Sequence, residues 1–190
     1  MPVYHARGRS SARIARIKAM PVLRFPVDVI MERVPLASRW ADAKWQPSAV
    51  VPAGEPSAEP EAASAQPELM HDGPEGAQWR FPGHAIELHR SEGEGYFLNL
   101  SSPRPCVFVM WRTAEQAQPP AVVPVVVTVS YHEAARMMDA GEQVEPVALP
   151  PPVLAWMQPF VAEHYKPEPR RKVRRNDPFA EDAGRPPRGR

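Results

Sequence analysis

The sequence contains very little cysteine and no long apolar run. A single cysteine, Cys106, in 190 residues excludes an internal disulfide framework and any thiolate-rich metal or iron–sulfur site within one chain. No stretch approaches the roughly 20 apolar residues of a membrane-spanning helix. The basic N-terminal segment also lacks the apolar run of a secretory signal. We therefore expect a soluble, cytoplasmic protein without membrane contact.

Motifs that carry chemistry are also missing. A phosphate-binding glycine loop is not expected, because Gly93 and Gly95 lie among acidic residues that would repel an anion. His84 and His89 are five residues apart, which would point them to opposite faces of a strand, so they cannot readily chelate one metal ion. Cys106 begins the most apolar segment of the chain, where burial makes a thiol inert. We expect no catalytic residues, no cofactor and no metal.

Proline and charge are abundant but unevenly distributed. The 26 prolines keep much of the backbone out of helices and central strands. The net charge is +1, yet residues 1–20 and 166–175 contribute +5 each and residues 176–190 balance, which leaves −9 for residues 21–165. We predict a disordered basic extension over 1–19, a folded domain over 20–165 and a disordered basic tail over 166–190.

An acidic, proline-rich segment interrupts the predicted domain. Residues 52–77 contain six acidic residues and five prolines but no lysine or arginine. Leu69 and Met70 are its only large apolar side chains, too few to offset the entropy of ordering the segment. We interpret residues 52–77 as a disordered acidic insert whose simplest role is a solvated spacer.

Apolar alternation predicts strands on both sides of this insert. Residues 23–31 alternate, with one face apolar and the other mostly polar, and indicate a half-buried strand, near a sheet edge because Pro26 lacks a backbone donor. A second strand is expected over 44–51. Residues 85–90 and 96–100, joined by a glycine-bearing loop, indicate a hairpin. Residues 106–111 and 125–129 indicate buried strands.

Acidic residues gather around the predicted hairpin. Glu87, Glu92 and Glu94 could suggest paired acid–base catalysis, but exposed hairpin tips commonly carry such charges for solvation. We favour solvation.

Two helices are expected at the C-terminal end of the domain. Ser130 and Glu133 match a capping box, after which a short helix ends at Gly141. A second amphipathic pattern runs from Val153 to His164, with a kink or two short turns expected at Pro159. The fold class predicted is α+β, a single small domain with a mainly antiparallel sheet of about five to six strands and two short C-terminal helices.

Two surfaces are candidates for binding a partner. The pairs Arg39–Trp40 and Trp79–Arg80 lie near the two ends of the insert and combine residue types enriched in interface anchors. The tail contributes a basic cluster of Arg170, Arg171, Lys172, Arg174 and Arg175. Such a cluster binds acidic protein surfaces or nucleic acid, or it serves only as a solubilising tail. No recognised nucleic-acid-binding module accompanies it, so a protein partner is the stronger expectation.

Several segments together resemble a known family. They are residues 28–45, 94–100, 127–135, 139–142 and 164–169. Together they resemble a proteobacterial family known only as a domain of unknown function, over nearly all of residues 20–175. Residues 1–19 and the acidic insert fall outside the resemblance, and Pro159 departs from it.

The resemblance implies a function only indirectly. The family has no assigned activity, so no catalytic residue carries over. Its genes often neighbour those of molybdenum-dependent formate dehydrogenases and their maturation factors, which implies an accessory or assembly role with such a protein as partner. The primary expectation is therefore a non-enzymatic accessory protein acting through protein–protein contacts. The alternative is a nucleic-acid-associated protein that binds through its basic tail.

Overall fold

A computed structural model describes residues 23–56, 66–114 and 120–167. In this part of the chain, strands and helices follow one another in the order β1 (Leu23–Pro35), β2 (Ala43–Pro52), β3 (Glu68–Gly73), β4 (Gly76–Leu88), η1 (Arg90–Glu92), α1 (Gly93–Leu100), β5 (Cys106–Thr113), β6 (Val122–Thr128), α2 (Tyr131–Asp139), β7 (Gln143–Ala148) and α3 (Pro151–His164). The fold is α+β in a single small domain, as predicted. None of the described helices is long and apolar enough to cross a membrane.

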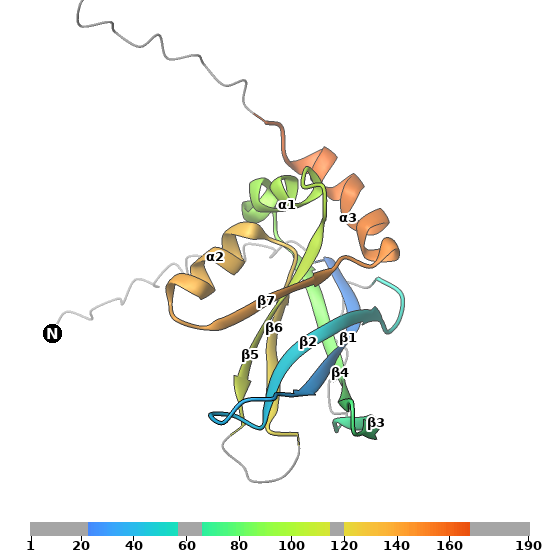
Figure 1. Ribbon diagram of the computed structural model, residues 1–190. Helices are drawn as coiled ribbons and strands as arrows, with labels where there is room; N and C mark the ends of the chain where they lie inside the picture. Colours follow the sequence, from blue (N-terminus) through green and yellow to red (C-terminus); the bar gives the residue numbers. More distant parts are fainter. Residues whose placement is uncertain (1–22, 57–65, 115–119, 168–190) are drawn as a thin grey trace, which may run out of the picture.

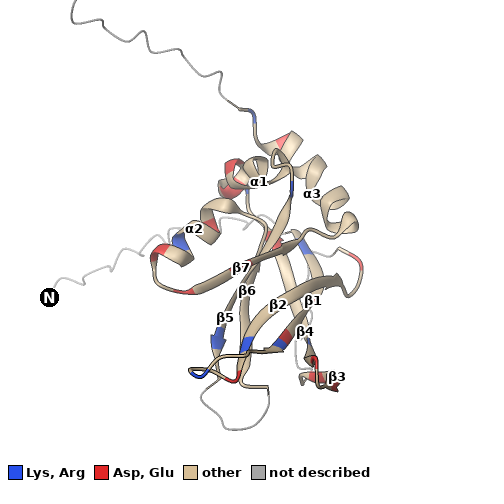
Figure 2. Ribbon diagram, viewed as in Figure 1, with Lys and Arg blue, Asp and Glu red and all other residues tan. Residues whose placement is uncertain are grey.

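The strands form two antiparallel sheets rather than the single sheet expected. One sheet has the order β2-β1-β4-β3 and the other the order β6-β5-β7. Strand β2 lies beside β7 and β4 beside β6, so that the two sheets enclose a common core (Figure 1). An ion pair from Lys44 to Glu145, at 3.4 Å, joins β2 to β7. Charged residues are found at strand ends and on α1 and α2 (Figure 2).

Strand β1 forms where the sequence predicts a strand, but it is neither half-buried nor at a sheet edge. Phe25, Val27, Val29 and Met31 are buried in the core. Asp28 and Ile30, on the face predicted to be exposed, are also buried. Strand β1 pairs with β2 on one side and β4 on the other, so it is not an edge strand. Pro26 is accommodated because it lies near the end of the strand, where its carbonyl still accepts from the Ala53 amide at 3.0 Å.

Strand β2 is present as expected, but a bulge changes which of its residues are buried. Its register with β1 shifts beside Ser48, so that Ile30 pairs with Ala49 and Met31 with Pro47. The extra residue reverses the alternation, and Val50 rather than Val51 enters the core.

The disorder predicted for residues 52–77 is wrong for residues 68–73 and 76–77, which lie in strands. Residues 68–73 form strand β3, which pairs antiparallel with the start of β4. The hairpin closes through Gly76, whose φ of 132° suits glycine. Pairing with β4 therefore orders a segment that has little apolar content of its own. Residues 57–65, the predicted extension 1–19 and the tail beyond residue 167 lie outside the described residues.

The predicted hairpin over residues 85–100 is wrong in its second half. Residues 85–88 end strand β4, but residues 93–100 form helix α1. Tyr96 is fully buried and its ring packs edge-on against Phe160 of α3, with centroids 6.2 Å apart. The segment contains alternating apolar residues, and burial of Tyr96 and Asn99 on one helical face overrides that pattern.

The two C-terminal helices form largely as predicted. Helix α3 is a single helix that contains Pro159, so the two short turns considered for this segment do not occur. Strand β7, between the two helices, was not predicted. It pairs with β5, which is the central strand of its sheet.

Candidate groove between β4 and β6

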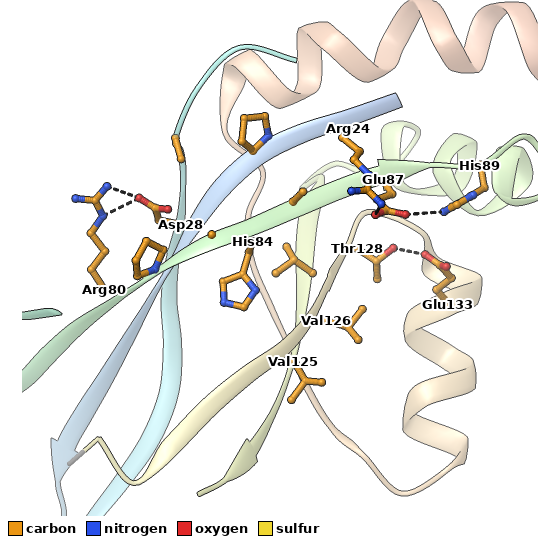
Figure 3. A pocket seen from close by; sticks show the side chains of 16 residues that line it. Arg24, Asp28, Arg80, His84, Glu87, His89, Val125, Val126, Thr128 and Glu133 are labelled. Carbon is orange, nitrogen blue, oxygen red and sulfur yellow. Dashed lines mark hydrogen bonds and ion pairs between the residues drawn. The ribbon is translucent and has the colours of Figure 1, made fainter. Parts of the chain in front are cut away.

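A groove of about 630 Å³ opens where the two sheets meet at β4 and β6. Its volume lies within the range of about 300–1,000 Å³ typical of ligand sites. The lining residues come from β1, β4, β6, α2 and the chain after β2 and β4, and they are Arg24, Pro26, Asp28, Ala53, Arg80, Pro82, Gly83, His84, Ala85, Glu87, His89, Val125, Val126, Val127, Thr128 and Glu133. We call this site the β4–β6 groove (Figure 3).

A β-bulge in β4 shapes the centre of the groove. Strand β1 pairs Val27 with His84 but Val29 with Phe81, so β4 contains one more residue than β1 over this stretch. Gly83 has a φ of 83°, in the left-handed region that favours glycine. The bulge turns His84 toward β6, where its imidazole lies across from Val125 and Val126 (Figure 3).

The bulge also leaves a buried carboxylate on β1. Asp28 has no register partner on β4 and is 1% exposed. Its Oδ2 accepts a hydrogen bond from Arg80 Nε at 2.6 Å, and a second Arg80 nitrogen lies 2.5 Å from the same oxygen. Arg80 also approaches Glu68 at 3.6 Å. The hydrogen bond to Asp28 and the charge of Asp28 raise the pKa of Arg80, so the guanidinium stays charged. At this end of the groove it links β4 to the Asp28 carboxylate of β1.

The other end of the groove contains two carboxylates in different surroundings. The Glu87 carboxylate forms an ion pair with the Arg24 guanidinium at 2.6 Å, and its other oxygen lies 3.3 Å from His89 Nε2. Glu133, at the start of α2, accepts a hydrogen bond from the Thr128 hydroxyl (Figure 3). Among the described residues, no cation pairs with Glu133.

The His84 imidazole is neutral at ordinary pH. Burial lowers its pKa below the usual value, and the charge of Asp28 opposes this only in part. A neutral imidazole offers one donor and one acceptor to a ligand. The described lining residues contain one hydroxyl, Thr128, which is already hydrogen-bonded to Glu133 and to the Ser130 amide.

A pH titration of stability tests the environment of His84. Because its pKa is lower in the folded protein than in the unfolded chain, the unfolded state binds more protons below about pH 6.5. We expect the free energy of unfolding to fall as pH decreases through this range toward the folded pKa. In His84→Gln this fall becomes shallower in urea titrations at pH 7.5, 6.5 and 5.5. His71→Gln, at an exposed position of β3, is the control and should keep the wild-type slope.

The structure separates the residues predicted to bind a partner. Trp40 is 82% exposed in the loop after β1, and its ring stacks under the Arg39 guanidinium at 4.6 Å. Trp79 instead packs against the core, because it lies in the interior of β4 between Met31 and Leu69. Arg80 belongs to the Asp28 ion pair in the groove. Trp79 and Arg80 therefore form no common exposed pair, and the predicted tail cluster 170–175 lies outside the described residues.

The predicted solvation role of the acidic residues near residue 90 is wrong for Glu92. Its carboxylate accepts from the Ser130 hydroxyl at 2.7 Å and from Arg136 at 2.8 Å. Burial raises the pKa of Glu92, but the hydrogen bonds from Ser130 and Arg136 outweigh it and the net shift is downward. Glu92 thus connects η1 to α2.

The predicted capping box is half correct. The Ser130 hydroxyl accepts from the Glu133 amide at 3.2 Å, as expected. However, the Glu133 carboxylate does not reach back to the Ser130 amide and instead accepts a hydrogen bond from the Thr128 hydroxyl. The Ser130 amide donates its hydrogen bond to the oxygen of the same hydroxyl. Helix α2 ends as predicted, with Gly141 at a φ of 84°.

Sequence reasoning missed the groove itself. Its centre depends on Asp28, which stands in a polar position of an alternating strand, and on His84, which looked like a scattered histidine. The available signal was Pro82 followed by Gly83 inside a strand pattern, a combination that indicates a bulge. Cys106 is half-buried rather than part of the core, and this partial burial raises the pKa of its thiol. Nowhere in the described ranges do three or more potential ligands gather to hold a metal ion.

Comparisons with known proteins identify a family but no activity. No curated protein and no solved structure matches the chain. One family model matches residues 26–174, which include every described strand and helix apart from the first residues of β1. The chain therefore belongs to the family described as "Protein of unknown function (DUF3305)".

Proposed function

We propose that this protein is a non-enzymatic accessory or assembly protein that acts in the cytoplasm through protein–protein contacts. The observation that carries the proposal is the exposure of Trp40. A tryptophan that is 82% exposed leaves a large apolar surface in water, and its ring is held under Arg39. Tryptophan and arginine are the residue types most enriched among interface hot spots.

The resemblance noted in the sequence supplies the class of partner. Gene neighbourhood implies a subunit or maturation factor of a molybdenum-dependent formate dehydrogenase. The basic cluster 170–175 would add electrostatic attraction to an acidic partner surface. The alternative function, association with nucleic acid through the same cluster, predicts binding that weakens steeply with salt.

Affinity capture of the tagged full-length chain from cells that naturally make it, with nuclease present, tests the proposal. We expect a stoichiometric formate dehydrogenase subunit or maturation factor. Trp40→Ala should reduce its recovery at least tenfold, because an interface anchor is removed. The free energy of unfolding should change by less than about 0.5 kcal/mol, because the side chain is exposed.

Two comparisons make the result decisive. Met138→Ala removes a side chain that is 49% exposed on α2 and should leave capture unchanged. A chain ending at Tyr165 shows how much the tail contributes. Recovery of nucleic acid alone, or equal capture by the Trp40→Ala variant, would contradict the proposal.

A further inference from the structure

The β4–β6 groove lies between two strand edges that no described strand pairs with. Strand β3 pairs with β4 only as far as Arg80, while β1 occupies the other side of β4 over its whole length. Strand β6 pairs with β5 alone. The edge of β4 beyond Phe81 and the outer edge of β6 therefore border the same groove.

The free part of the β4 edge is short and well defined. At one end Pro82 lacks a backbone donor. At the other end the Tyr96 hydroxyl donates to the Glu87 carbonyl at 3.3 Å and accepts from the His89 amide at 3.0 Å, which closes the edge. The stretch from Gly83 to Ile86 remains. Unpaired edge groups of this kind are the template on which an extended peptide adds to a sheet.

The charge of the groove indicates the chemistry of such a peptide. Three carboxylates line the groove, against two arginines that are both engaged in ion pairs with Asp28 and Glu87. The carboxylate left over is that of Glu133, which is half-buried and bound only to the Thr128 hydroxyl among the described residues. One lysine or arginine from a ligand would balance it.

We propose that the β4–β6 groove binds an extended segment of a partner protein, which lies along the free edges of β4 and β6 and directs a lysine or arginine side chain to Glu133. The proposal rests on the proposed function and adds to it the contact site and the chemistry of the bound segment. Exposed Val125 on β6 and the apolar rim beside His84 provide room for the side chains next to the basic one.

Selection from a library of random decapeptides displayed on phage, with the immobilised full-length chain as target, tests the proposal. We expect enriched peptides to carry a lysine or arginine between β-branched or aromatic residues. The best peptide is then synthesised with a fluorescent label and its Kd measured by fluorescence anisotropy. Hydrogen exchange should show new protection at residues 83–86 and 125–128 on peptide addition.

Substitutions on both sides of the contact establish its geometry. Glu133→Gln keeps an acceptor for Thr128 but removes the charge, and should weaken peptide binding at least tenfold. Glu163→Gln, at an exposed carboxylate on α3, is the matched control and should bind like the wild type. Replacing the basic residue of the peptide by norleucine should weaken its binding to the wild-type protein. The same replacement should not weaken binding to the Glu133→Gln variant any further, because the charge that the basic residue pairs with is already gone.

The inference would be overturned if no peptide were enriched above the bare support, if the enriched peptides lacked a basic residue, or if the peptide bound Glu133→Gln as tightly as the wild type. It would also be overturned by tenfold tighter peptide binding after deletion of residues 1–19, which would identify the chain's own basic segment as the occupant. Failure of the peptide experiment leaves capture through Trp40 intact, and failure of capture leaves peptide binding intact, so the two proposals fail separately.

Discussion

Gly95→Ala should destabilise the protein by about 2 kcal/mol, although alanine is the better helix former. A Cβ at this position of α1 would lie 2.3 Å from the Ser130 hydroxyl oxygen and 3.2 Å from the His132 amide nitrogen. Ser130 is fully buried and cannot yield, because its hydroxyl is hydrogen-bonded to Glu92 and to the Glu133 amide. Overpacking of about 3 kcal/mol is offset only in part by a gain of about 1 kcal/mol in helix propensity. The urea midpoint measures the loss.

A graded control and a coupled variant identify the cause. Gly93→Ala lies in the same helix, but its Cβ would meet the Tyr165 side chain at 3.1 Å, near the end of the domain, so we expect a smaller loss. Ser130→Ala removes the clashing oxygen but also the N-cap of α2. The double variant of Gly95→Ala and Ser130→Ala should therefore be more stable than the sum of the single changes implies. Simple additivity would show that the contact is not the cause.

Asn99→Leu should be the most damaging single substitution, with a loss of about 4 kcal/mol. The Asn99 side chain is fully buried and makes three hydrogen bonds. Its Nδ2 donates to the carbonyls of Cys106 at 2.7 Å and Val129 at 2.8 Å, and its Oδ1 accepts from the Cys106 amide at 2.9 Å. Leucine has a similar volume but leaves all three backbone groups without this partner in the interior. Urea denaturation followed by circular dichroism measures the effect.

Asn99→Asp separates hydrogen bonding from packing. An aspartate keeps the acceptor for the Cys106 amide but places a negative charge against two carbonyl oxygens. The pKa of the new carboxyl should rise on folding, so this variant should gain stability relative to the wild type as pH falls below that pKa. Asn99→Leu has no such titration. If the free energy of unfolding of Asn99→Asp differed from that of the wild type by the same amount at every pH from 4 to 8, the assigned contacts would be contradicted.

Both predictions concern the junction of α1 with the β6–α2 connection. Gly95, Asn99 and Ser130 lie in segments that carry the family resemblance, and the structure gives each of them a packing or hydrogen-bonding role. The proposed contacts with a partner, through Trp40 and Glu133, depend on this junction only indirectly, since it fixes α2 beside β6.

Local patterns predicted the elements whose residues interact mainly with near neighbours. Short-range chemistry accounts for the existence of strand β1, the apolar β5, the Ser130 cap and the glycine end of α2. The segment 93–100 did not, because its apolar spacing fits a strand as well as a helix. Burial of Tyr96 and Asn99 against distant partners made the choice. Strand β3 likewise forms only because β4 offers an edge.

The sequence by itself determined the α+β class, the antiparallel pairing and the concentration of positive charge at the two ends of the chain, since these depend on periodicity and composition. The tertiary structure alone decided the division into two sheets, the bulge at Gly83 and the groove that His84, Asp28 and Glu133 line. These features bring together residues more than a hundred positions apart, and local propensity contains no information about which distant edges will face each other.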